Sequence, residues 1–387
     1  MGPNIGSKVA ARPTSCYLRL LAVNRNLHLD VLASVRLHLV AGNDRCSRAR
    51  LVEIDVAKGL AILLVVFGHI GARETPAGVE WYEPLRRTIY LFHMPFFMYL
   101  SGFATFYSGA ARTPVAAWPS LIRRRAGRLL VPFFGLGLLV LVGKLLAARA
   151  VAVDNVPAGL GPGLLGLLWN TAESPAGSVW YVFVLFIYAA ATPLLIRMTK
   201  GHAMDLIAPA LLLYAVPIPA IVYLDRVGAN FVFFLAGGLA AEAGGVWQSW
   251  IDRWRWRLLL SFGALLAALW AIGGVPAIGP GGAKWAHKAA MLAAGLLSAP
   301  ALHALARTEL VRRSRVLLAL GTLSFAIYLL NTICIGIAKA ALSEFLLWNE
   351  ANFHPFAGAL MVAGVLGPMI LKTLVFRRFR FIDRITS

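Results

Sequence analysis

A lysine and a histidine share one face of an apolar stretch near the start of the chain. Lys58 and His69 are eleven residues apart in V-E-I-D-V-A-K-G-L-A-I-L-L-V-V-F-G-H-I, which on an α-helix is three turns plus about 20° and a rise of roughly 16 Å. His69 is a candidate general base, because histidine can take a proton near neutral pH. Lys58 is a candidate contact for an anion, with Asp55 one turn earlier as its expected ion-pair partner. A purely structural explanation stays open: a lysine that snorkels to an interface and a histidine that bonds a neighbouring helix.

A cluster of arginines follows in S-L-I-R-R-R-A-G-R-L-L-V-P. Arg125 and Arg128 are three residues apart and share a helix face, with Arg123 and Arg124 beside them. Guanidinium groups match the geometry of phosphate oxygens, so the pair predicts a phosphate-binding site. The alternative is routine anchoring of a membrane protein by basic residues at its cytoplasmic surface.

Two further polar residues lie within apolar segments. His93 occurs in T-I-Y-L-F-H-M-P-F-F-M-Y-L-S-G-F, at about the depth of His69 if the two segments are antiparallel neighbours. Pro95 frees the backbone carbonyl of residue 91, which His93 or a water can satisfy. Ser101 and Gly102 permit a close approach of another helix. His93 fits a substrate contact and a helix–helix hydrogen bond equally well.

The composition of the chain indicates which class of secondary structure holds these residues. The chain has 387 residues, of which 59% are hydrophobic and 14% charged, and its mean hydropathy is +0.73. Soluble domains carry about 25% charged residues, so this chain cannot cover a water-facing surface. A soluble enzyme, a coiled coil and a disordered protein are excluded. We predict an all-α, polytopic membrane protein.

Ten charge-poor segments are long enough to cross a bilayer, which takes about 20 residues. They are 54–71, 87–107, 129–148, 178–197, 203–224, 229–247, 257–273, 284–305, 316–338 and 356–376. Pro209, Pro217 and Pro219 would kink or break the fifth. The stretch 158–170 is too short and too rich in Gly and Pro to span, and is expected to be interfacial or re-entrant.

The distribution of basic residues predicts the orientation. Lys and Arg number 37 against 17 Asp and Glu, and most of the 37 fall in segments on the same side as the N-terminus, whereas the few on the other side include Arg86 and Arg87. The positive-inside rule then places both termini in the cytoplasm of a multi-pass protein of the cell (inner) membrane. Because the cations lie between apolar runs, no nucleic-acid partner is expected.

Three regions follow from this pattern. Residues 1–50 are expected to form a basic, poorly ordered cytoplasmic tail, or to lie upstream of the functional start, and they carry no secretory signal. Residues 51–376 form the transmembrane domain, and 377–387 a short basic cytoplasmic tail. The three cysteines have neither the spacing of a metal cluster nor that of a disulfide framework, so no metal is expected.

Several motifs occur in a family-specific order. They are Lys58–x10–His69, the F-H-M-P-F-F…L-S-G-F run, R-R-R-A-G-R before L-V-P, W-Y-V-F-V-L-F at 180–186 and L-S-F-A-I-Y-L-L-N at 323–331. Together they resemble the integral-membrane acyltransferase-3 family, and within it the fucose 4-O-acetylase-like branch, over about 51–376.

The resemblance implies transfer of an acyl group, usually acetyl, from a coenzyme A thioester to a hydroxyl, commonly on a sugar of a cell-envelope glycan. The family's functional basic residue and histidine, and its R-x-x-R pair, fall on Lys58, His69, Arg125 and Arg128. Many relatives have Arg at the position of Lys58. Relatives often carry a histidine where this chain has Asn331, and asparagine cannot take a proton near neutral pH, which puts a proton relay there in doubt.

We expect these residues to have separate roles in binding the donor and in catalysis. The cations hold the phosphates of acetyl-CoA, which is the acyl donor and not a permanently bound cofactor, while the pantetheine arm reaches His69. His93 and Asn331 are candidate substrate contacts, and both of them, with Ser101, are candidate oxyanion donors. Direct transfer is preferred to an acyl-histidine intermediate, because no second base is evident. The expected partners are acyl-CoA, a glycan or lipid-linked sugar acceptor, and the lipid bilayer.

Two other functions compete with this one. Ten spans, segments interrupted by Gly and Pro, and sparse intramembrane charges also suit a secondary transporter or flippase for a glycolipid-like substrate. Inverted repeats would favour that class, and the sequence shows none. A non-catalytic scaffold of a glycan-export complex is the third possibility.

Overall fold

The computed structural model describes residues 51–71, 76–149, 153, 155–272, 282–379, 383 and 386. In the helix that begins at Gly282, side chains are described from Trp285 onward. The expected tail 1–50 and most of 377–387 lie outside these residues. The described chain is built of helices and contains no β-strand beyond one isolated bridge, Asn170–Ile221. This confirms the predicted all-α class.

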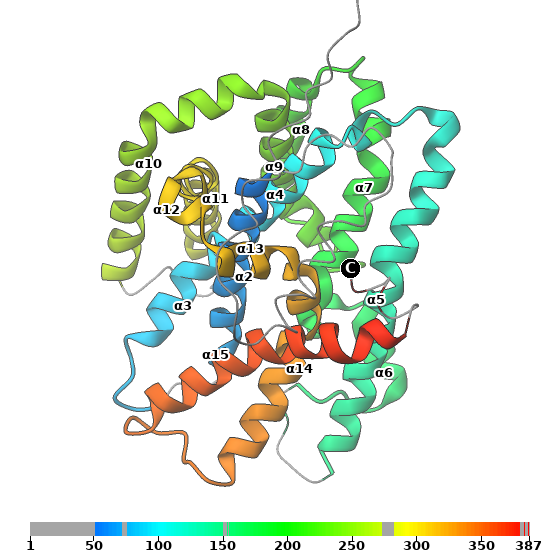
Figure 1. The fold of residues 1–387 in the computed structure, drawn as a ribbon. Coiled ribbons are helices and arrows are strands. Elements are labelled where there is room, and N and C mark those ends of the chain that lie inside the picture. Colours follow the sequence, from blue (N-terminus) through cyan, green and yellow to red (C-terminus); the bar gives the residue numbers. More distant parts are fainter. Residues whose placement is uncertain are drawn as a thin grey trace, which may run out of the picture. The chain divides into compact units, whose positions relative to one another are not determined.

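Figure 1 shows the order of the α-helices along the described chain. They are α2 (Val52–Ile70), α3 (Tyr82–Tyr90), α4 (His93–Tyr107), α5 (Trp118–Ala147), α6 (Leu160–Leu168), α7 (Trp180–Met198), α8 (Ile207–Ala215), α9 (Leu224–Ala243), α10 (Gly245–Ala271), α11 (Gly282–Arg307), α12 (Glu309–Arg312), α13 (Arg315–Thr322), α14 (Ser324–Ser343) and α15 (Phe353–Ile370). Helix α2 lies in the middle, in contact with α3, α4, α11, α13, α14 and α15, while α5 and α10 lie on opposite sides.

Seven helical stretches in the described residues are long and apolar enough to cross a membrane. They correspond to seven of the ten predicted spans. Of the other three, 54–71 forms α2, whose Glu53, Asp55 and Lys58 make it more polar than the rest. The segment 257–273 lies in α10, and 203–224 contains only the nine-residue α8.

Prolines account for two of the predicted spans that are not one continuous helix. Two others, 229–247 and 316–338, are divided without a proline, at Gly244 and at Leu323. In 203–224, Val216 adopts an extended conformation before Pro217, as the residue preceding a proline prefers, and α8 ends. In 87–107, the chain breaks at Phe92 into α3 and α4, so that Pro95 falls in the first turn of α4, where a missing N–H costs nothing. Conversely, α5 begins at Trp118 and not at 129, so the arginine cluster lies inside the helix.

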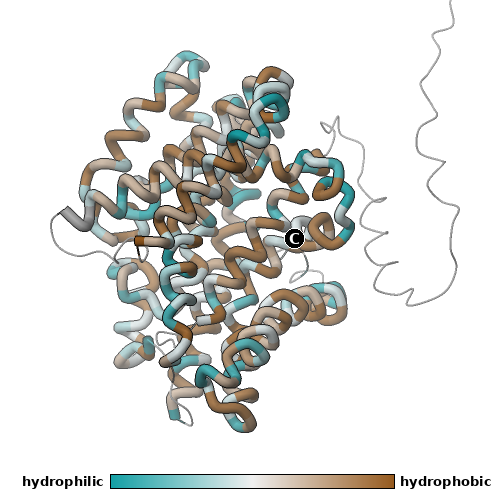
Figure 2. The backbone as a smooth tube through the Cα atoms, turned by 90° about the vertical axis from the view of Figure 1, so that its left-hand side faces the viewer, coloured by the Kyte–Doolittle hydropathy of each residue, from teal (hydrophilic) through white to brown (hydrophobic). Residues whose placement is uncertain are grey.

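Apolar side chains remain exposed on the outer faces of the helices. Leu139, Leu212, Leu260, Ile337 and Val362 are each more than half exposed. Figure 2 shows hydrophobic residues along most of the helical backbone, the peripheral helices included. A soluble monomer rarely exposes so much apolar surface, whereas a bilayer covers it. The protein is therefore a polytopic membrane protein.

Glycines let α4 and α9 cross at very short distance. A Cβ atom added to Gly102 would lie 1.8 Å from the backbone oxygen of Phe234, and one added to Gly237 would lie 1.9 Å from that of Tyr99. Small residues at such crossings allow the two backbones to touch. The close approach predicted at Gly102 is confirmed.

We expect Gly102→Ala to lower the free energy of unfolding by about 1–3 kcal/mol, because the new methyl group overlaps a backbone carbonyl that cannot move aside. Gly143→Ala is the matched control on α5, where an added Cβ meets nothing within 4 Å. The control should leave stability unchanged or raise it by up to about 1 kcal/mol. Thermal unfolding in detergent measures both, and equal effects would contradict the prediction.

Arg307, at the end of α11, joins three helices. Its Nε and Nη2 donate to Asp252 Oδ1 and Oδ2 of α10 at 3.1 and 2.8 Å, and its Nη1 donates to Glu53 Oε1 of α2 at 3.1 Å. The hydrogen bonds from Arg307 and Arg255 hold the pKa of the Asp252 carboxyl below its usual range.

This depressed pKa predicts acid sensitivity. A carboxyl of this kind contributes stability above its unfolded pKa of about 3.9, and the contribution is lost as the pH falls through the lower folded-state value. We expect the Tm to drop on acidification below about pH 4, and Asp252→Asn to lower the Tm near neutral pH and to flatten that drop. Glu344→Gln, which changes an exposed carboxylate outside this network, should leave the curve unchanged. An Asp252→Asn curve that parallels the wild type would contradict the assignment.

Candidate functional site

Helix α2 carries Lys58 on its first half and His69 in its last turn. Lys58 Nζ lies 3.3 Å from Asp55 Oδ1, and the Asp55 carboxylate is buried. The predicted ion pair is therefore confirmed. The lysine side chain keeps 29% of its surface exposed, so it can still meet a second anion.

His69 and His93 lie at the same end of the bundle. They are close enough to interact electrostatically, and the Arg86 guanidinium is a further charged neighbour of His69. His69 is half-buried, whereas His93 is buried and its ring centre lies 4.9 Å from that of Tyr90, with the two rings tilted by 34°. The structure thus brings the predicted base and one predicted substrate contact to one place.

The tautomer of His93 follows from one hydrogen bond. Its Nδ1 lies 2.9 Å from the backbone oxygen of Ile89, and a carbonyl can only accept. In the neutral ring Nδ1 therefore carries the proton, and Nε2 keeps a lone pair that can accept a proton or a hydroxyl hydrogen. The expectation that His93 would satisfy the carbonyl of residue 91 is wrong, because the break between α3 and α4 presents the carbonyl of Ile89 instead.

Arginines line a pocket at the opposite end of α2. Arg124, Arg125 and Arg128 of α5 surround a hollow of about 510 Å³ whose other wall is the turn around Gly109 and Thr113. Arg125 is half-buried and Arg128 is exposed, with its guanidinium 5.9 Å from the centre of a phenylalanine ring of α14.

The arginines of this pocket differ from other cations of the bundle. Neither Arg125 nor Arg128 forms an ion pair with any carboxylate of the described chain. By contrast, Arg112 is paired with Glu242 at 2.6 Å, and Arg307 with two carboxylates. Uncompensated guanidinium groups around a hollow are suited to an anionic ligand such as a phosphate.

Asn331 is fully buried in α14. Its Nδ2 donates to the backbone oxygens of Ile327 and Tyr328 at 2.9 and 2.8 Å, while its Oδ1 has no partner in the described structure. With both amide hydrogens used, Asn331 is not arranged as an oxyanion donor. Ser101 is also engaged, because it donates to the Phe97 oxygen and lies 2.5 Å from a tyrosine hydroxyl.

Residues 51–373 match the sequence model of the family described as "Acyltransferase domain". The chain belongs to the acyltransferase-3 family. The match includes α2 to α15, and with them every candidate site residue from Lys58 to Asn331.

Two nodulation proteins have sequences similar to this chain. NolL of Mesorhizobium japonicum is 27% identical over 230 residues, which are 57% of this chain and 56% of the relative. NolL of Sinorhizobium fredii is 28% identical over 196 residues, which are 50% of this chain and 49% of the relative. The chain spans about half the length of these curated relatives, and no solved structure matches it.

The candidate residues form two groups. His69 and His93 lie at one end of α2, and Lys58, Arg125 and Arg128 lie toward the other, where a second hollow of about 480 Å³ adjoins the arginine pocket through Thr113. Neither hollow is lined by Lys58 or His69. The passage that would connect the two groups therefore stays a prediction.

The sequence did not predict one polar cluster beside His69. Glu83 forms ion pairs with Arg86 and Arg87, each at 2.8 Å, and Arg86 lies over the ring of Tyr90. These residues had been counted as ordinary cations and apolar flanks of an outer loop. In E-P-L-R-R-T-I-Y, Arg86, Arg87 and Tyr90 follow Glu83 by three, four and seven residues. This helical spacing could have predicted that the four side chains share one face.

Proposed function

We propose that the protein is a membrane O-acyltransferase that moves an acetyl or similar short acyl group from acyl-CoA to a hydroxyl of a cell-envelope or exported glycan. The observation that carries this proposal is the pairing, within one bundle, of an uncompensated arginine pocket and a histidine pair at the other end of α2. Membership of the acyltransferase-3 family supports it.

The donor binds at the arginine end. Arg125 and Arg128 hold the phosphates of acyl-CoA, and Lys58 supplies a further cation nearer the middle of the bundle. Guanidinium forks give charge-assisted, bidentate contacts to phosphate oxygens, which fix both position and orientation. The pantetheine arm then runs along α2 toward His69, a rise of roughly 16 Å on a helix.

In the proposed reaction, the acyl group leaves the thioester of the donor and forms an oxygen ester with the acceptor. The acceptor oxygen attacks the thioester carbonyl while its proton passes to an imidazole nitrogen of His69. The C–S bond then breaks, and the departing thiolate takes that proton from the imidazolium of His69, so the products are an O-acyl ester and free CoA. A thioester is already activated, so positioning and a base are the main requirements.

The acceptor binds at the histidine end. His93 borders His69 and keeps a free Nε2, which suits a sugar hydroxyl as donor. The free Oδ1 of Asn331 is likewise an acceptor, so it fits a hydroxyl of the acceptor better than an oxyanion. A sugar acceptor agrees with the sequence's resemblance to the fucose 4-O-acetylase-like branch.

The orientation follows from the supply of the donor. Acyl-CoA is made in the cytosol, so the arginine end faces the cytoplasm, in agreement with the positive-inside rule. Both termini are then cytoplasmic, the membrane is the cell (inner) membrane, and the histidine end faces outward.

Comparison of surface glycans and glycolipids from cells with and without the protein tests the function. The proposal predicts sugars that carry an additional acetyl or short acyl ester only when the protein is present, and that lose it on mild alkaline treatment. Identical mass profiles, or a change in the amount of glycan without a change in its acylation, would exclude it.

A further inference from the structure

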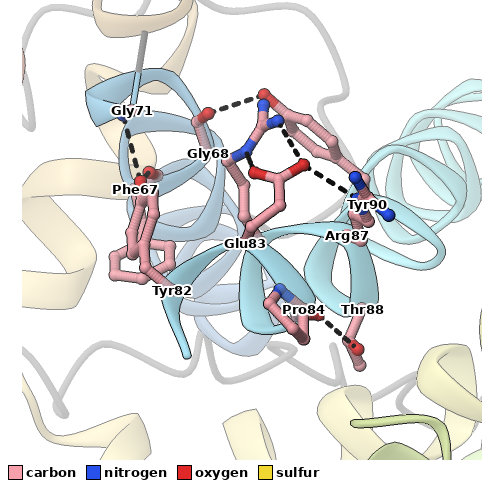
Figure 3. Close-up of polar contacts among 10 residues, drawn as sticks. Phe67, Gly68, Gly71, Tyr82, Glu83, Pro84, Arg87, Thr88 and Tyr90 are labelled. Carbon is pink, nitrogen blue, oxygen red and sulfur yellow. Dashed lines mark hydrogen bonds and ion pairs between the residues drawn. The ribbon is translucent and has the colours of Figure 1, made fainter. Parts of the chain in front are cut away.

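Two tyrosine hydroxyls cap the end of α2 that carries His69 (Figure 3). The last carbonyls of a helix lack N–H partners within the helix. Tyr82 donates its hydroxyl to the backbone oxygen of Phe67 at 3.1 Å and accepts the N–H of Gly71 at 3.0 Å. Tyr90 donates to the backbone oxygen of Gly68 at 2.6 Å. Two carbonyls of this last turn, those of Phe67 and Gly68, are thus satisfied from α3.

Glycines let both tyrosine rings lie directly on the backbone of α2. A Cβ atom on Gly68 would be 2.6 Å from the ring of Tyr90, and one on Gly71 would be 2.5 Å from the ring of Tyr82. Gly68 immediately precedes His69, and Gly71 follows His69 by two residues. The rings therefore clamp the turn from which the imidazole projects.

An ion pair holds the second ring in place. Arg86 donates from Nε and Nη2 to Glu83 Oε2 and Oε1 at 2.8 and 2.9 Å, a bidentate pair, and its guanidinium carbon lies 5.2 Å from the centre of the Tyr90 ring. Bidentate geometry fixes the guanidinium plane, and a cation over an aromatic face is attracted to it. Arg87 bonds the same carboxylate at 2.8 Å and keeps Glu83 oriented.

We propose that Tyr82 and Tyr90, with Arg86 and Glu83 behind them, are positioning residues that hold the last turn of α2 and so aim the imidazole of His69. The inference rests on the proposed function, in which His69 is the general base. Helix ends fray when their terminal groups lack partners, and a base acts only within hydrogen-bond reach of the proton it takes. A displacement of about 1 Å can cost roughly a hundredfold in rate.

Tyr90→Phe in the full-length protein tests this, because it keeps the ring and removes only the hydroxyl. We expect kcat for acyl transfer to fall by roughly ten- to a hundredfold while the KM for acetyl-CoA stays within about twofold, since the donor phosphates bind elsewhere. Tyr82→Phe should act in the same direction. Arg86→Lys should retain more activity than Arg86→Met, because an ammonium group can still pair with Glu83.

Tyr188→Phe is the matched control. Its hydroxyl donates to the backbone oxygen of Val227 at 2.7 Å, the same type of bond to a helix carbonyl, but between α7 and α9. It should lower the Tm about as much as Tyr90→Phe and leave kcat unchanged. A Tyr90→Phe protein with wild-type kcat, or equal losses of kcat in the two variants, would overturn the inference.

His69→Ala separates the inference from the function on which it rests. If His69→Ala transfers acyl groups as well as the wild type, the proposed base is wrong, whatever the tyrosine variants do. If His69→Ala is inactive and Tyr90→Phe is fully active, only the clamp is wrong.

Discussion

His69→Ala should abolish acyl transfer while the protein remains folded. General-base catalysis typically contributes about 10²- to 10⁴-fold to the rate, and the methyl group of alanine can take no proton. His69→Gln should be equally inactive, because an amide can form a hydrogen bond but does not take a proton near neutral pH. Initial rates of transfer from labelled acetyl-CoA, with purified protein in detergent, measure the loss.

A substitution of a second histidine serves as the control for His69→Ala. His202 lies exposed in the connection between α7 and α8, and His202→Ala should leave the rate unchanged. The Tm and gel-filtration profile of each variant report whether it is folded. A folded His69→Ala protein that retains more than about a tenth of the wild-type rate would contradict the general-base assignment, given the size of the effect expected.

Arg125→Gln and Arg128→Gln should raise the KM for acetyl-CoA by about ten- to a hundredfold each, with a smaller change in kcat. Hydrogen bonds to charged groups contribute about 1.5–3 kcal/mol, and each 1.4 kcal/mol is tenfold in affinity. The two arginines lack a carboxylate partner within the described chain, so neither substitution breaks an ion pair of the protein itself. The double variant should bind donor only at concentrations beyond the physiological range.

Arg123→Gln is the matched control on the same helix. Arg123 is exposed and does not line the pocket, so its loss should change KM by less than about twofold, as for a surface charge. Raising the salt concentration should weaken donor binding in the wild type more than in the double variant, because free charges are screened. Equal KM values for the wild type and all four variants would place the phosphates elsewhere.

Local features of the sequence predicted the parts of the fold that depend on neighbouring residues. The composition gives the all-α membrane class, and α2 begins and ends within two residues of the predicted 54–71. The spacing of Asp55 and Lys58 predicted their ion pair. Gly102 predicted a close helix crossing, although the sequence could not say that α9 would be the partner.

Features that depend on distant residues were not predicted. The early start of α5 was not predicted, because the helix continues through an arginine-rich turn that hydropathy does not report. The clamp on α2 needs hydroxyls of Tyr82 and Tyr90 to meet carbonyls of a different helix. His303 was likewise passed over, although it is fully buried and its Nδ1 lies 2.8 Å from the Tyr99 hydroxyl.

A transporter or a scaffold with the same helix bundle would leave the substrate chemically unchanged. A transporter or flippase would move a substrate across the membrane unchanged, and a scaffold would move nothing. Neither function needs a base aimed by tyrosine hydroxyls, or a phosphate pocket at the opposite end. An acyl-histidine intermediate would be revealed by exchange of label between acetyl-CoA and free CoA without acceptor, which direct transfer does not produce.

The most direct test uses vesicles that contain the purified protein in one orientation. Acetyl-CoA labelled in the acetyl group is supplied on the side of Arg125 and Arg128, and a sugar acceptor is enclosed on the side of His69. The account predicts label in ester linkage to the enclosed acceptor and unlabelled CoA outside, both absent with His69→Ala. Label inside the vesicles only as free acetyl-CoA, or an acceptor that stays unlabelled when cell extracts of every sugar class are tried, would contradict it.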